Sequence, residues 1–228
     1  MARWQVRRPG CNTSSPLARS VADAHPGPMR LHALMLLIRD HSTGATALAA
    51  GALVCPHPGC GGVLGPWGHA RTRHRRITAS RFEAHTPRRT RCRSCERTQV
   101  LITAAGYPRR ADTAENVGQA TLAAANGAGS KRIALQLGLP ATTVRDWLRR
   151  TRLNADRVRA AATVAAHRLD PMLTPIAPTG TVLGDMVEAI GRAVQASIQR
   201  LGPLAPPWHL AVWLTGGAAL APPPRPSG

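Results

Sequence analysis

The chain has 228 residues and a mass of 24.2 kDa, which allows one or two small domains. Its 30 lysines and arginines oppose 11 aspartates and glutamates, and the resulting net charge of +19 favours an anionic partner, nucleic acid before an acidic membrane surface. Five Trp, one Tyr and one Phe are too few aromatic residues for a large single core or for a surface that stacks a run of single-stranded bases.

The charge has a second explanation, because nearly all of these cations are arginines beside many Ala, Gly and Pro residues. A GC-rich genome produces the same composition through its codons. The distribution of the charge is therefore more informative than its total. Residues 71–97 are rich in arginine and hold only two acids, whereas the basic character stops after Ala160.

The N-terminal region begins with Pro-, Gly- and Ser-containing sequence, so we expect residues 1–28 to be a disordered leader, absent if translation starts at Met29. Residues 29–54 are expected to be a lead-in segment with a short strand or helix. Their apolar run, Leu31–Ile38, is too short to cross a membrane and lies too far from Met1 for a signal peptide. These features favour a cytoplasmic protein without a membrane partner.

The five cysteines suggest a metal site. Cys11 lies alone in the leader and is expected to be free, whereas the others form two close pairs, Cys55-x4-Cys60 and Cys92-x2-Cys95. A reducing cytoplasm disfavours disulfides, and four thiolates in two pairs suit tetrahedral zinc. Four thiolates leave no open position for water, so we expect a structural zinc ion and not a catalytic one.

Short alternating segments flank the second cysteine pair, and together with the first pair they predict a zinc ribbon over residues 50–105. The expected strands are Arg71–Ile77, Arg89–Cys92 and Thr98–Thr103. His57 and His69 are reserve ligands. The arginines of this domain, in particular Arg88, Arg89 and Arg91, are candidates for contacts with DNA phosphates. The alternative is that they form an ordinary solvated surface.

The segment from Asp112 to Arg159 has the clearest helical periodicity. It predicts three helices. The first is capped by Asp112 or Thr113 and ends at Gly127. The second, Lys131–Leu137, is capped by Ser130, and the third, Val144–Leu153, is capped by Thr142 or Thr143. The spacing of four residues is the one that a helix-turn-helix over residues 130–150 requires: a small Ala134, a glycine at turn position 138, and apolar Val144 and Trp147. An ordinary helical hairpin within a bundle is the alternative.

The solvent side of the third helix is the predicted DNA-reading surface. It carries Arg side chains that suit guanine and phosphate, and hydroxyls that suit the DNA backbone. Its members are Thr142, Thr143, Arg145, Asp146, Arg149 and Arg150. Asp146 is expected either to accept from cytosine or to orient Arg149 or Arg150.

The C-terminal region is expected to complete a helical domain over residues 111–217. Apolar residues recur every three to four positions from Val182 to Leu201 and predict an amphipathic helix that Gly202 ends; a short helix from Pro207 to Thr215 follows. The apolar face favours core packing over a homodimer contact. Residues 218–228 are Pro-rich at their end and are expected to be a disordered tail.

The order of these motifs resembles a family of uncharacterised actinobacterial proteins that join a zinc ribbon to a transposase-like helix-turn-helix. The likeness spans about residues 45–220. The segments that carry it are Cys55-Pro…Cys60-Gly-Gly, Pro87-Arg-Arg-Thr-Arg-Cys92-Arg-Ser-Cys95, Arg109-Arg-Ala-Asp112, Arg132-Ile-Ala…Leu-Gly-Leu-Pro-Ala-Thr-Thr-Val-Arg-Asp-Trp-Leu-Arg149, and Leu214-Thr-Gly-Gly217. The resemblance implies that the four cysteines are metal ligands and that residues 130–150 read DNA. The x4 spacing of the first pair departs from the commoner x2 form.

Together these features predict an α+β, mainly α protein, in which a small β zinc ribbon precedes a helical domain with a helix-turn-helix. The expected function is sequence-directed binding of double-stranded DNA, as a transcriptional regulator or a mobile-element accessory. The DNA-binding part of a transposase and an RNA-binding zinc module are the alternatives. We do not expect an enzyme, because the acidic residues are scattered and form no cluster that could hold catalytic magnesium.

Overall fold

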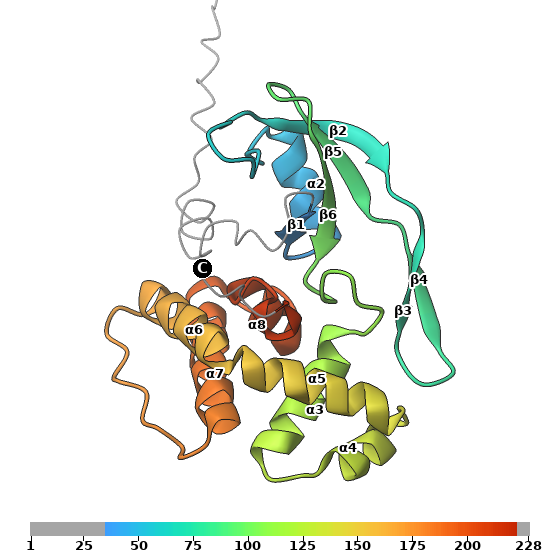
Figure 1. Ribbon diagram of the computed structural model, residues 1–228. Helices are drawn as coiled ribbons and strands as arrows, with labels where there is room; N and C mark the ends of the chain where they lie inside the picture. The colour runs from blue at the N-terminus through green and yellow to red at the C-terminus, as the bar shows by residue number, and fades with distance from the viewer. Residues whose placement is uncertain (1–34, 223–228) are drawn as a thin grey trace, which may run out of the picture.

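A computed structural model describes residues 35–222 of the chain (Figure 1). The predicted leader with Cys11, the first part of the lead-in segment, and the end of the predicted tail lie outside the described residues. Within them, strands and one short helix precede a series of helices, so the chain is of mixed α/β type. This agrees with the predicted order of a small β part followed by a helical part.

The β part contains a four-stranded sheet with the order β1-β6-β5-β2. Its strands, in chain order, are β1 (Met35–Ile38), β2 (Leu64–His69), β5 (Arg88–Cys92) and β6 (Thr98–Thr103). Strand β1 pairs parallel to β6, and the other neighbours are antiparallel. Helix α2 (His41–Ala49) connects β1 to the cysteine region. The side chain of Asp40 caps this helix by accepting from the backbone N–H of Thr43.

A separate hairpin leaves the sheet between β2 and β5. It consists of β3 (Arg73–Arg76) and β4 (Phe82–His85), which pair antiparallel. Figure 1 shows this hairpin extending away from the sheet and down beside the helices. The predicted strand Arg71–Ile77 is therefore present as β3, but it belongs to a protruding two-stranded ribbon and not to the sheet with the cysteines.

The helical part follows directly. Its elements are α3 (Ala114–Ala125), α4 (Ser130–Leu137), α5 (Ala141–Leu153), α6 (Ala155–Leu169), α7 (Val182–Leu201), α8 (Pro207–Leu214) and the short 3-10 helix η1 (Ala218–Leu220). The predicted amphipathic helix and its end at Gly202 are confirmed by α7, whose apolar face is buried mainly against α6. Helix α6 was not predicted, because its buried face is made largely of alanines, which give a weak periodic signal.

The two parts have apolar cores of very different size. The helical part has one continuous buried cluster that extends from Ala104 to Leu220. The cluster around the cysteines has only Leu48 and Leu64 as buried residues besides Cys55 and Cys92. The β part therefore has little apolar burial of its own near the cysteines, which is typical of small domains that depend on a metal or disulfides.

Three boundary predictions are wrong. The lead-in segment contains the expected strand and helix, β1 and α2, but β1 adds to the free edge of β6, so the sheet begins at Met35 and not at residue 50. The residues before α4 and α5 are Gly129 and Pro140, and neither helix has a side-chain cap, so Ser130, Thr142 and Thr143 do not cap them. The helical part extends past residue 217, because the apolar side chains of η1 are buried against α5 and α6.

Candidate metal centre and nucleic-acid interface

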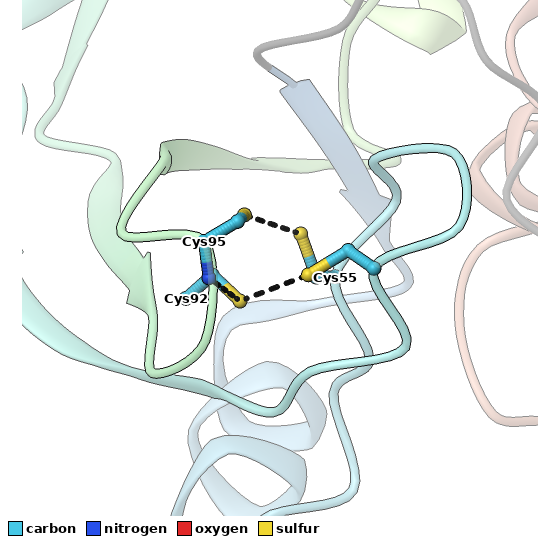
Figure 2. Close-up of side chains that lie close together, drawn as sticks. Cys55, Cys92 and Cys95 are labelled. Carbon is cyan, nitrogen blue, oxygen red and sulfur yellow. Dashed lines mark hydrogen bonds between the residues drawn. The ribbon is translucent and has the colours of Figure 1, made fainter.

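Two turns bring the four cysteines of the described residues together. The first turn, residues 55–62, lies between α2 and β2, and the second, residues 92–97, connects β5 to β6. The backbone N–H of Arg93 donates to the carbonyl of Val63 at 2.9 Å, which ties the second turn to the first. Cys92 and Cys95 project from the second turn towards Cys55 (Figure 2).

Two of the sulfur–sulfur distances match the edges of a tetrahedral thiolate site. All four Sγ atoms lie within 4.8 Å of one another. Cys55 and Cys95 are separated by 3.7 Å, and Cys60 and Cys92 by 3.6 Å. Tetrahedral zinc with bonds of about 2.3 Å requires edges of about 3.8 Å between its sulfurs, whereas a disulfide requires about 2.05 Å. The predicted cluster of Cys55, Cys60, Cys92 and Cys95 is therefore present, and it has the geometry of a possible metal site.

The second turn also stabilises a thiolate without help from an ion. The backbone N–H groups of Ser94 and Cys95 donate to the Sγ of Cys92 at 3.4 and 3.5 Å. These bonds, that from Cys95 first, lower the pKa of Cys92 to about 6. Burial has the opposite effect on the facing ligand and raises the pKa of Cys55 to about 12. A bound cation would supply the charge that keeps Cys55 deprotonated.

Gly62 lies directly against the cluster. A Cβ at this position would lie 2.7 Å from the Sγ of Cys92 and 2.5 Å from the Oγ of Ser94, both closer than van der Waals contact allows. The Gly62 carbonyl also accepts from the backbone N–H of Cys55 at 2.7 Å. The absence of a side chain at residue 62 therefore lets the first turn approach the second.

We predict that Gly62→Ala weakens metal binding, because the added methyl pushes the Cys92 sulfur out of the tetrahedron. The expected loss is about 10- to 100-fold in affinity, the usual effect of disturbing the surroundings of metal ligands. Competition with a coloured zinc chelator measures it. Gly65→Ala is the matched control: like Gly62 it has no positive φ, but a Cβ there would make only ordinary contacts, 3.5 Å from the Arg93 side chain, so it should retain more affinity than Gly62→Ala.

Neither reserve histidine belongs to the cluster. Among the described residues, the four cysteines are the only group of three or more potential ligands found close enough to share an ion. His57 is half-buried within the first turn, where its carbonyl accepts from the Cys60 N–H, and His69 is exposed at the end of β2.

Helix α5 displays the predicted DNA-reading residues on one side. Thr142, Arg145 and Arg149 are exposed, and Arg149 keeps 61% of its side-chain surface. The opposite side of the helix is buried in the helical core through Val144, Trp147, Leu148 and Thr151. Thr143 and Arg150 lie half-buried at the edge of the exposed side.

Asp146 orients the arginines that follow it on α5. Its carboxylate accepts from Arg149 at 2.9 Å and from Arg150 at 2.9 Å, and Arg110 lies 4.0 Å away. The hydrogen bond from Arg150, followed by that from Arg149, lowers the pKa of Asp146. The structure therefore favours the orienting role over the cytosine-accepting role that the sequence left open.

The arginines of the β part that were predicted to contact DNA differ in their exposure and in the contacts that they make. Arg88 is exposed at the start of β5. Arg89 is half-buried and points towards the Thr98 hydroxyl at 3.5 Å. The guanidinium of Arg91 stacks on the Trp67 ring, 4.7 Å from its centroid, and pairs with Glu96 at 2.8 Å. The Arg91 side chain is therefore fixed on the sheet by Trp67 and Glu96, whereas the sequence predicted a free phosphate contact.

Sequence reasoning missed the residue that joins the two parts. The sequence left Asp112 and Thr113 as alternative caps of α3, and the structure confirms Thr113, whose side chain accepts from the N–H of Asn116. Asp112 is buried and accepts from Arg76 of β3 at 2.9 Å and from the Trp147 indole of α5 at 3.1 Å. No local pattern could have revealed this contact, because its partners lie 36 residues before and 35 residues after it.

Comparisons of this chain with protein-family models, with curated proteins and with solved structures find no match. Within residues 35–222, none of the helices combines the length and apolar character that crossing a lipid bilayer requires.

Proposed function

We propose that this protein binds double-stranded DNA through a helix-turn-helix formed by α4 and α5, and that a structural zinc ion bound by the four cysteines stabilises the neighbouring sheet. The observation that carries the proposal is the exposed arginine side of α5, which projects from a helix whose other side is fixed in the core. A rigid helix with such a surface suits the major groove.

The turn between α4 and α5 supports this interpretation. Gly138 adopts the left-handed conformation, with φ 61°, and its N–H donates to the last turn of α4. Ala134 and Ile133 are buried where α5 crosses α4, and Val144 and Trp147 fill the angle from the other helix. A small residue in the first helix and glycine in the turn are what this motif needs.

The chemistry of the exposed side also supports duplex binding. Arg145 has no partner among the described residues, and Arg149 is exposed and donates to Asp146. Guanidinium groups in such positions suit guanine edges and phosphates, and Thr142 at the start of the helix suits a backbone contact. Arg150 is half-buried at the edge of the exposed side of the same helix and would contact the DNA backbone. Arg88, Arg89 and Arg91 remain candidate phosphate contacts of the sheet.

Zinc is the metal that suits the cysteine cluster best. Four thiolates at tetrahedral spacing match its preference, and they leave no position for a substrate or a reactive water. The ion would therefore hold the turns at residues 55–62 and 92–97 together and would not catalyse a reaction. A catalytic centre forms no part of the proposal.

Selection from a pool of random duplexes is expected to recover a preferred site, and Arg149→Ala is expected to relax the choice at one position of that site. Loss of a bidentate contact to guanine costs about 1–3 kcal/mol of discrimination. Binding measured on the selected site and on single-base variants gives this quantity. Arg168→Ala removes an exposed charge from α6 and is the matched control, with unchanged discrimination expected.

Two outcomes would contradict the proposal. An equal loss of affinity on every sequence would make Arg149 a phosphate contact without a reading role. Recovery of structured RNA in preference to duplex DNA, in a parallel selection, would identify an RNA-binding module instead.

A further inference from the structure

The β3–β4 hairpin has an exposed end that the packing of the protein does not explain. Phe82 is the only phenylalanine of the chain, and 53% of it is exposed. Arg81 beside it is exposed, as is the whole turn 78–81. A single exposed aromatic side chain is common on protein surfaces, but this one lies beside Arg81 at the end of a projecting ribbon, so an apolar ring and a cation are offered together.

The end of the hairpin is nevertheless well ordered by its own hydrogen bonds. The Arg81 carbonyl accepts from the N–H groups of Ile77 and Thr78 at 2.9 and 3.1 Å. The Arg81 N–H donates to the Thr78 hydroxyl at 3.1 Å. The turn therefore presents Arg81 and Phe82 from a fixed backbone, which lowers the entropy cost of binding a partner there.

The hairpin is also fixed to the helical part, at the base of its turn. The Asn116 side chain on α3 donates to the carbonyls of Arg76 and Ile77, the latter at 2.9 Å. Arg76 binds Asp112, which in turn accepts from Trp147 of α5. Because these contacts are buried or half-buried, the hairpin and α5 are held in a fixed relation to one another.

The contacts between the hairpin and α5 involve the buried side of α5, through Trp147, and a neighbouring residue also reaches its exposed side. Arg110 lies two residues before Asp112 and 4.0 Å from Asp146, the carboxylate that orients Arg149 and Arg150. In Figure 1 the hairpin descends beside the part of the molecule that contains α3, α4 and α5. The charge of the hairpin suits the same partner, because Glu83 is the only acid of residues 71–86 and, of their five arginines, Arg71 and Arg81 are exposed and Arg73 is half-buried, whereas Arg75 is buried and Arg76 is paired with Asp112.

We propose that the β3–β4 hairpin is a second DNA-binding element, which contacts the duplex beside the site of α5 through Arg81 and Phe82. Arg81 would pair with phosphate, and Phe82 would pack its apolar ring against deoxyribose. A ribbon of two strands is narrow enough to approach a groove of the duplex. This inference rests on the proposed function, and it adds a contact outside the helix-turn-helix.

The test compares the full chain with a variant that carries both Arg81→Ala and Phe82→Ala, on the duplex selected with the unchanged protein. We expect an affinity loss of about tenfold or more and a salt dependence lower by about one phosphate contact. Hydroxyl-radical footprinting should show that protection is lost on one flank only. Arg168→Ala removes one exposed charge from α6 and should leave the footprint unchanged.

The outcomes separate the two proposals. If the unchanged protein binds no duplex, the proposed function fails. If it binds, and Arg149→Ala alters its sequence choice while the hairpin variant keeps the affinity and the full footprint, only the hairpin inference is overturned. A hairpin variant that loses self-association without DNA, in sedimentation experiments, would also overturn it. If the double variant is unstable, Arg81→Ala alone is measured, because an exposed arginine can be removed without disturbing the fold.

Discussion

Cys92→Ser is expected to abolish metal binding and to unfold the sheet around the cysteines. The Cys92 sulfur lies 3.6 Å from that of Cys60 and accepts from two backbone N–H groups, so it organises the second turn and would also hold the proposed ion. Structural zinc sites contribute about 10–16 kcal/mol of apparent binding free energy at neutral pH. Metal analysis should give one zinc per unchanged chain and none per variant.

The helical part should survive this change, because its continuous apolar core does not include the cysteines. Amide hydrogen exchange separates the two parts: protection should be lost across β2, β5 and β6 and retained across α6 and α7. A chelator added to the unchanged protein should produce the same pattern.

The matched control is Cys11→Ser, which removes the fifth thiol of the chain and leaves both pairs intact. We expect it to keep one zinc and the protection of the sheet. A Cys92→Ser protein that melts and exchanges like the unchanged chain would refute a structural metal. Loss of zinc in Cys11→Ser would refute the assignment of the four ligands.

The features that sequence could predict are those with a strong local signal. The two cysteine pairs are each brought together by a short turn, and the spacing of the pairs identified all four members of the cluster. The long amphipathic pattern of α7 and the left-handed Gly138 were equally visible, because each reflects a local rule of helix geometry. The exposed side of α5 follows from the same periodicity.

The features that sequence could not predict depend on contacts between distant segments. The pairing of β1 with β6 joins residues more than 60 positions apart, and a parallel strand pair has no turn signature between its members. Residues 218–220, which were predicted to belong to the tail, were misjudged for a similar reason. The alanines of η1 have no periodicity of their own, and Asn154 fixes the segment by donating to the carbonyl of Ala219 in η1 and to that of Ala221 directly after it.

Asp112 is the position where a single substitution should most damage the junction between the two parts, and Asp112→Ala is expected to lower the free energy of unfolding by about 3 kcal/mol. Loss of one partner leaves the other buried groups without compensation, which costs about 3–5 kcal/mol for a buried ion pair. The lower end of this range applies here, because 21% of the Arg76 side chain is exposed and the guanidinium can bind water once Asp112 is removed. Urea unfolding followed by circular dichroism measures the change.

Two further variants distinguish the junction from a general loss of charge. Asp156→Ala removes an exposed carboxylate that lies 3.7 Å from Arg159, and its effect should stay within about 0.5 kcal/mol. Trp147→Phe removes the indole N–H while retaining most of the buried ring, and should have an intermediate effect. If Asp112→Ala unfolds at the same urea concentration as Asp156→Ala, the buried contacts with Arg76 and Trp147 do not hold the hairpin against the helices. In that case the hairpin would move independently of α5, and the fixed spacing between the two proposed DNA contacts would be lost.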